Sequence, residues 1–329
     1  MADTTALLER LENLDKETHR EFFQLKDLEF VNNEEGKNIR IGDNMVGLSK
    51  DSFSSLCNTL EIPALYANRC PAEEQSRMVN YWLRQRKDIM HSALITDGKV
   101  RTFMESNYTY VPTNKIINTV LNMIPDDFIV GNYSLKPDAL EAQIFTPEFT
   151  QHVVDSEIRG GLRIVYSDSW AMTPKFDTYL YRVMCTNGLV SPLAGKKFRI
   201  AGKSEEELLS QVREYIKTSL EQMPTMFQGF LDLEEQKVEN WIATVRKIIL
   251  ENKLPKKLAD ILIMTADTVE FKMTIRGRIE SMHDIVNLIT YVGTHNREIS
   301  DAHREALMEI AGHMTVHSAA RCYGCGSKV

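Results

Sequence analysis

The residues near the carboxyl terminus include a set of side chains that could bind a metal ion. His313 and His317 are four residues apart, which places two side chains on one face of a helix, and Cys322 and Cys325 form a Cys-x-x-Cys pair. Two imidazoles and two thiolates can complete a tetrahedral zinc site. The spacing is compressed relative to that of zinc fingers, and the alternative is that these are terminal residues without a ligand.

A second set of residues has the chemistry of nucleic-acid binding. Residues 158–203 carry eight basic side chains and only two acidic ones, a local charge of +6. Aromatic residues lie among them, including Tyr166, Trp170, Phe176, Tyr181 and Phe198. Basic side chains can neutralise phosphates while aromatic rings stack on bases. The alternative is an ordinary solvated face, with the rings turned into the core. The eight predicted nucleic-acid-binding residues, called the basic strip below, are Arg159, Arg163, Lys175, Arg182, Lys196, Lys197, Arg199 and Lys203.

Nucleophilic catalysis has little support in the sequence. Cys185 would need a positioned base and a lowered thiol pKa, and no nearby histidine or paired carboxylate supplies them. We therefore expect a buried packing residue at Cys185. Neither a phosphate-binding glycine loop nor a nucleophile-elbow motif occurs in the sequence. We predict a protein that is not an enzyme and needs no cofactor, with zinc as the one alternative.

Composition limits the classes of protein that remain. The 329-residue chain has a net charge of −7, which argues against indiscriminate coating of nucleic acid. It contains no apolar run of about 18 residues, the minimum for a membrane-spanning helix, so we expect no membrane contact. Five cysteines, an odd number, fit reduced thiols better than a disulfide framework. These features predict a cytoplasmic protein.

The residues above must be positioned by strands in the middle of the chain and by helices after them. Runs at 162–166 and 178–185 predict a central antiparallel pair, and Asp97-Gly98 joins two short strands in a hairpin. About six strands with short connections predict an α+β fold: a mainly antiparallel sheet with helices on one side and a C-terminal helical region. We expect an N-terminal helix and loop at 1–47, an α+β core at 48–203, and a helical region at 204–329 that packs on the core.

Several helix boundaries can be predicted as well. Leu7, Leu8, Leu11 and Leu14 recur at helical spacing and predict an amphipathic N-terminal helix. Residues 32–47 are rich in Asn and Gly and predict a loop with a short strand near 39–41. Ser204 to Glu207 form a capping box. We expect Pro224 to interrupt the helix that follows, and a new long helix to cover about 228–250.

Four stretches resemble a known family: residues 52–83, 98–121, 181–191 and 283–295. The most specific is the Arg-x-x-Cys-x-Asn-Gly-Leu string that begins at Arg182. With these stretches the chain resembles the phage/plasmid-like protein family, which is found on phages, plasmids and integrated elements. The resemblance implies a mobile-element protein of the bacterial cytoplasm, without an established activity. By analogy it suggests work beside DNA recombination or replication.

Together these features predict a non-enzymatic phage protein that binds single-stranded DNA along its sheet. Strand annealing and assembly into a homo-oligomer are further expectations. The main alternative is a protein–protein interaction factor whose acidic amphipathic helices, at both ends of the chain, bind a host or phage partner. A third reading is an enzyme whose residues converge only in the folded chain.

Overall fold

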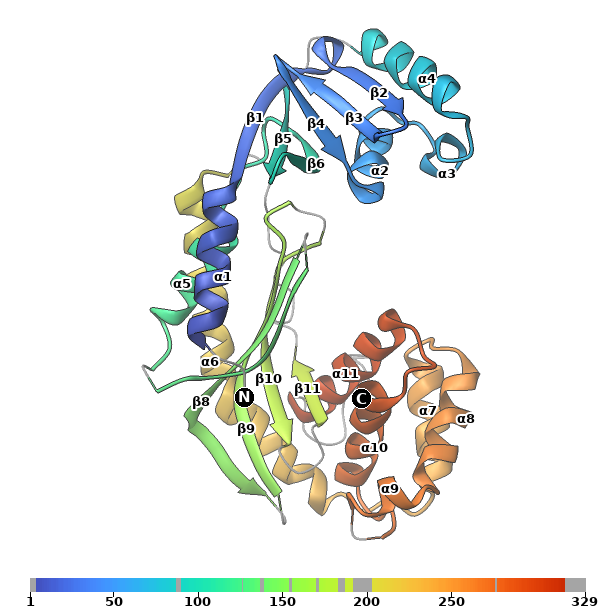
Figure 1. Ribbon diagram of the computed structural model, residues 1–329. Coiled ribbons are helices and arrows are strands. Elements are labelled where there is room, and N and C mark those ends of the chain that lie inside the picture. The colour runs from blue at the N-terminus through green and yellow to red at the C-terminus, as the bar shows by residue number, and fades with distance from the viewer. Residues whose placement is uncertain are drawn as a thin grey trace.

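The chain folds around two separate β-sheets. This computed structural model describes residues 4–86, 90–125, 127–136, 139–153, 156–169, 172–182, 187–191, 203–275 and 277–316. Sheet A forms the upper module in Figure 1, and sheet B lies below it with helices on both of its sides. Both sheets are mainly antiparallel and the C-terminal region is helical, so the predicted α+β class is confirmed.

Sheet A has six strands in the order β1-β5-β6-β4-β3-β2. All neighbours are antiparallel except β4 and β6, which are parallel. The predicted hairpin is confirmed: Asp97 and Gly98 adopt φ angles of 51° and 67° between β5 and β6. The strands are β1 (Thr18–Gln24), β2 (Glu29–Asn33), β3 (Gly36–Ile41), β4 (Asn44–Leu48), β5 (Met90–Thr96) and β6 (Lys99–Glu105).

Four strands of sheet A come from residues 18–48, which include the stretch 32–47 that was predicted to be a loop. Only the short strand near 39–41 was expected, and it corresponds to β3. The other three strands are short and mix polar with apolar residues, so their pattern resembles that of a loop. They are stabilised as strands because Phe23, Phe30 and Val46 are buried in one core with residues of α2 and α4. Strand β4 crosses the domain boundary expected at residue 47.

Helices α2 (Lys50–Thr59), α3 (Ala64–Ala67) and α4 (Ala72–Gln85) pack on sheet A, together with the 3-10 turn η1 (Leu25–Asp27). Helix α4 runs beside the edge strand β2. The Asn80 amide accepts from the Phe30 backbone N–H at 2.8 Å and donates to the Phe30 carbonyl at 2.7 Å. Ser76 Oγ accepts from the Asn32 N–H at 3.0 Å. Side chains of a helix therefore occupy hydrogen-bonding groups that the β2 edge would otherwise expose.

Sheet B has five antiparallel strands in the order β11-β10-β9-β8-β7. One face is covered by α1 (Thr4–Glu17), α5 (Thr113–Leu121) and α6 (Glu205–Glu235). Leu7 and Leu11 of α1 are buried in this core, which confirms the predicted N-terminal amphipathic helix. The strands are β7 (Ile129–Lys136), β8 (Ala139–Val153), β9 (Ser156–Tyr166), β10 (Lys175–Arg182) and β11 (Asn187–Ser191).

Helix α6 corrects the prediction that Pro224 ends a helix. The predicted capping box is present, because the Ser204 N–H donates to Glu207 Oε2 at 2.7 Å and the Glu207 N–H donates to Ser204 Oγ at 3.3 Å. The helix then continues through Pro224 to Glu235. Met223 and Met226 are fully buried on either side of the proline, so packing against the sheet and the C-terminal helices offsets the lost backbone hydrogen bond. The chain leaves the helix only at Gln236.

The C-terminal region comprises α7 (Trp241–Glu251), α8 (Lys256–Ala266), α9 (Val269–Lys272), α10 (Met282–His295) and α11 (Asp301–Val316). These helices share one apolar core with the second half of α6. Helix α11 also contacts the second face of sheet B, so sheet B has helices on both faces rather than one. Within the described ranges, no helix combines the length and the apolar content of a membrane span.

A buried ion pair connects the two sheets. Strand β6 contains one extra residue, Arg101, because Thr102 pairs with Leu94 and Val100 pairs with Ile95. The guanidinium of Arg101 donates to both oxygens of Asp168, at 3.0 and 2.7 Å. Asp168 lies two residues after Tyr166, the last residue of β9, and the side chains of Arg101 and Asp168 are only 9% and 3% exposed. The bulge in sheet A therefore directs a charge to the end of a strand in sheet B.

Loss of one partner of this pair leaves the other charge buried without compensation. We predict that Arg101→Ala lowers the free energy of unfolding by about 3–5 kcal/mol. The double variant Arg101→Met/Asp168→Leu should recover most of this loss, because it removes both charges. Urea unfolding measures both values. A double variant that is no more stable than Arg101→Ala would contradict the account.

The crossing of α6 and α11 depends on a glycine. A Cβ atom at Gly229 would overlap the backbone carbonyl oxygen of Thr315, which cannot move without its helix. We predict that Gly229→Ala lowers the free energy of unfolding by about 1–3 kcal/mol despite the higher helix propensity of alanine. Gly47→Ala is the control, because its Cβ would lie 3.5 Å from Lys99 Cγ, an ordinary contact. Equal losses in the two variants would refute the close crossing.

Candidate functional site

Strands β9 and β10 bring three residues of the basic strip together. Successive side chains of a strand point to opposite faces, and the register places Arg163 opposite Asp177 and Arg159 opposite Tyr181. Lys175, two residues before Asp177, lies on the same face. Arg159, Arg163 and Lys175 therefore project from the face of sheet B that α11 contacts.

Two of these cations are bound by carboxylates from distant parts of the chain. Arg163 donates to Glu141 Oε1 at 2.9 Å and to both oxygens of Glu305 on α11, at 2.9 and 3.3 Å. Lys175 donates to Glu305 Oε1 at 2.9 Å and lies 3.7 Å from Glu309 Oε1. The Arg163 side chain is only 12% exposed. A phosphate would have to displace carboxylates to reach it.

Acid–base properties agree with this pairing. Burial on its own would raise the pKa of Glu305, yet hydrogen bonds from Arg163 and Lys175 lower it to about 2. Burial would lower the pKa of Arg163, and its bonds to Glu305 and Glu141 raise it instead. Glu305, Arg163 and Lys175 therefore stay charged at neutral pH, and the carboxylate offsets the charge of the two cations.

Two further cations of the basic strip have described side chains, and both lie close to a glutamate. Arg159 Nε donates to Glu157 at 2.6 Å, and Lys203 Nζ lies 3.6 Å from Glu207. Arg182 is the last residue of β10, and its side chain lies outside the described part of the chain. Lys196, Lys197 and Arg199 also lie outside the described residues.

The described aromatic residues that lie among the basic strip in the sequence are mostly buried. Tyr166 and Phe176 are buried against the helices of the first face of sheet B, and the Tyr166 hydroxyl donates to the Val111 carbonyl at 2.7 Å. Tyr181 packs against Phe145, with ring centroids 5.3 Å apart. Trp170 and Phe198 lie outside the described residues. Of the described rings in the strip, Tyr181 alone retains some exposure for stacking on a base.

A different group of cations is exposed at the turn between α7 and α8. Five basic side chains lie within residues 246–260 against two acidic ones, a local charge of +3. All five are exposed, and within the described ranges only one of them, Lys247, has an ion-pair partner, Glu251 at 3.8 Å. The group, called the basic tip below, consists of Arg246, Lys247, Lys253, Lys256 and Lys257.

The helices that carry the basic tip hold it at the outside of the molecule. Helices α7 and α8 pack side by side and lie beyond α10 and α11, away from sheet B (Figure 1). Arg246 and Lys256 line the same cavity of about 340 Å³ between the two helices. Sequence analysis missed this group because the whole region 204–329 has a net charge of −4. A count over the turn alone would have found it.

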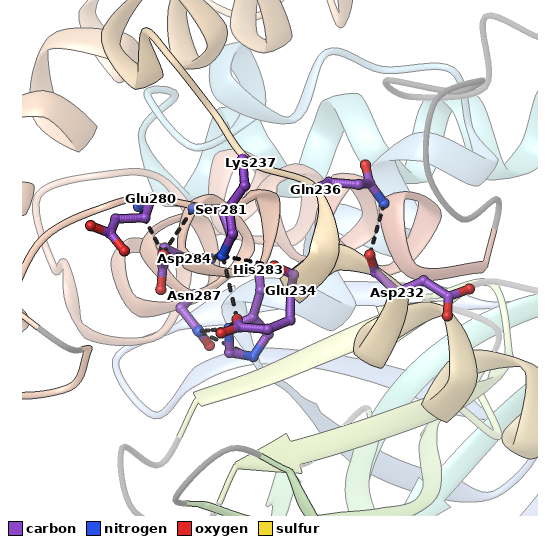
Figure 2. Close-up of polar contacts among 9 residues, drawn as sticks. All are labelled: Asp232, Glu234, Gln236, Lys237, Glu280, Ser281, His283, Asp284 and Asn287. Carbon is purple, nitrogen blue, oxygen red and sulfur yellow. Dashed lines mark hydrogen bonds and ion pairs between the residues drawn. The ribbon is translucent and has the colours of Figure 1, made fainter.

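The polar residues at the junction of α6 and α10 include the side-chain types of a catalytic triad. Figure 2 shows Ser281, His283 and Glu234 close together, but the serine is not directed at the histidine. Ser281 Oγ caps α10 by accepting from the Asp284 N–H at 3.3 Å, and it donates to Asp284 Oδ2 at 3.1 Å. His283 Nδ1 lies 3.3 Å from Glu234. These contacts join two helices, and we assign them a structural role.

The predicted zinc site cannot be assembled from the described residues. His313 lies on α11, whereas His317, Cys322 and Cys325 fall outside the described part of the chain. Among the residues that are described, no three His, Cys, Asp or Glu side chains are close enough to hold a metal ion. Zinc binding at the C-terminus stays a prediction.

Comparisons with known proteins do not add a relative. No family model matches the chain, and no curated protein and no solved structure matches it either. The resemblance to the phage/plasmid-like protein family therefore stays a prediction.

The charge network under α11 predicts a dependence of stability on pH. Burial raises the pKa of Asp177 from 3.8 to about 7, although Arg163 and Lys175 oppose this shift. Between these two values the folded state binds more protons than the unfolded state, so stability falls as pH rises, by at most about 1.4 kcal/mol per pH unit. Above about pH 7 this contribution is constant. Asp177→Asn should flatten the fall, as measured by urea unfolding at a series of pH values.

The control is Asp43→Asn, at an exposed position after β3. Glu305 acts in the opposite direction and at lower pH, because its lowered pKa removes stability only as the pH falls from 4.5 towards 2. A wild-type slope in the Asp177→Asn protein would show that Asp177 is not the titrating group.

Proposed function

We propose that this protein binds nucleic acid without catalysing a reaction, and that the basic tip makes the contact. The observation that carries the proposal is the contrast between two groups of cations. Arg163 and Lys175 of the basic strip are held by carboxylates, whereas Arg246, Lys253, Lys256 and Lys257 are exposed and have no ion-pair partner among the described residues.

Exposed, unpaired cations can neutralise phosphates without first losing another partner. Binding then releases the counterions of the nucleic acid, which is the main source of affinity that does not depend on base sequence. The first turn of α8 adds backbone N–H groups beside Lys256 and Lys257. The remainder of the chain is acidic, so it repels a polyanion and favours approach at the basic tip.

The chemistry of the basic tip favours contact with the sugar–phosphate backbone. The basic tip offers no aromatic ring for stacking on a base, and the neighbouring exposed residue Leu250 is aliphatic. Single-stranded DNA remains the form that we propose, because the family resemblance suggests work beside recombination or replication. Annealing and a homo-oligomer remain part of this proposal without an observation of their own.

The alternative function, binding of a partner by acidic amphipathic helices, has less support. Leu7 and Leu11 of α1 are buried in the core of sheet B. Leu307 and Ile310 of α11 are buried among the C-terminal helices. The apolar faces that would dock on a partner are therefore already covered by this chain.

We predict that the quadruple variant Arg246→Gln/Lys253→Gln/Lys256→Gln/Lys257→Gln weakens binding of a labelled oligonucleotide at every base sequence. If all four cations contact phosphates, the slope of log affinity against log salt concentration should flatten by about 3 for a single strand. Fluorescence anisotropy over a salt series, with single-stranded and duplex DNA, measures both effects.

The control replaces four exposed cations on the sheet A module, Lys50, Arg69, Arg84 and Lys99, by Gln. It makes the same change in net charge and should keep the wild-type slope. A Lys175→Gln/Arg159→Gln variant tests the basic strip. The proposal would be contradicted if the salt slope flattened in the strip variant and stayed at the wild-type value in the tip variant. It would also be contradicted if the wild type did not bind DNA.

A further inference from the structure

A polar cavity of about 690 Å³ lies where the sheet A module meets the connections to sheet B. One wall is the outer face of α2, and the opposite wall is the end of β6. Tyr108, between β6 and α5, Ser169, between β9 and β10, and His91 of β5 also line it. A cavity of this size, at a junction of two modules, is typical of a small-molecule site.

Two hydroxyl groups of the α2 wall, those of Ser54 and Thr59, are available to a ligand as hydrogen-bond acceptors. Ser54 Oγ donates its proton to the Lys50 carbonyl at 2.9 Å, and Thr59 Oγ1 donates to the Ser55 carbonyl at 3.1 Å. Both protons are used inside the helix, so the lone pairs of these oxygens remain for a ligand. A ligand that carries N–H donors fits such a lining.

The charges in the lining are unbalanced towards the negative. Asp51 and Glu105 line the cavity, and neither has an ion-pair partner among the described residues. The Arg101 charge is neutralised by Asp168. Glu61 has its own partner in Arg86, at 3.1 Å. A ligand that enters therefore meets two carboxylates whose charge no described side chain neutralises.

From this lining we propose that the cavity binds a small organic cation with several N–H donors, of the alkyl-ammonium or guanidinium class. Asp51 and Glu105 would contact the charged groups, and Ser54, Thr59 and Asn58 would accept hydrogen bonds along the ligand. An inorganic cation fits less well, because no three acidic, histidine or cysteine side chains of the described chain converge. This site is separate from the basic tip and does not depend on the nucleic-acid proposal.

The test is calorimetric titration of the full chain with agmatine, which has a guanidinium at one end and an ammonium at the other. The wild type should bind it saturably with one site per chain. The variant Asp51→Asn/Glu105→Gln should bind at least about tenfold more weakly, because it loses two charge-assisted hydrogen bonds. Asparagine is also accepted in the first turn of a helix, and circular dichroism checks that α2 remains folded.

The control variant Asp43→Asn/Glu34→Gln removes two exposed carboxylates of the same module that do not line the cavity. It should bind agmatine as the wild type does, and neutral 1,5-pentanediol should not bind. Equal weakening in both variants would show that only the overall negative charge attracts the cation, and would overturn the site. Binding of an arginine-containing peptide without binding of agmatine would also overturn it, since the ligand would then be a protein segment.

Discussion

The ion pair between Arg101 and Asp168 is the interaction on which the arrangement of the two sheets depends. Two buried charges lose their hydration, and their attraction compensates for that loss only while both hydrogen bonds keep good geometry. A small displacement of one module would separate them in a poorly hydrated environment. Burial, and the charge of Asp168, also raise the pKa of nearby Tyr110, so this hydroxyl stays neutral. The pair therefore fixes the position of sheet A and of the cavity wall relative to the connection after β9.

The distribution of charge in space differs from its distribution along the chain. Residues 158–203 look strongly basic in the sequence, but Glu305 and Glu309 lie on α11 and approach the same face of sheet B. Their charges make this face a network of ion pairs rather than a basic surface. The α7–α8 turn behaves in the opposite way, because within the described ranges only Lys247 of its five cations has an ion-pair partner. A cation is available to a ligand only where no carboxylate reaches it.

Local signals predicted much of the fold. The Asp97-Gly98 turn and the Ser204–Glu207 capping box are each determined by a few adjacent residues, and both occur as expected. Features that depend on distant contacts were missed. Strands β1, β2 and β4 are stabilised by burial against α2 and α4, and Pro224 stays within α6 because Met223 and Met226 next to it are buried. The partners of Arg163 are 22 and 142 residues away, so no local pattern could reveal them.

The contact between Asn80 and the backbone of Phe30 also restricts how copies of this protein could assemble. An open strand edge is a template on which a strand from another molecule can add, and this can lead to ordered oligomers or to aggregation. At β2 the template is already occupied by an asparagine and a serine from α4. Continuation of sheet A into a second molecule would therefore have to begin at the opposite edge, β1, which follows directly from α1.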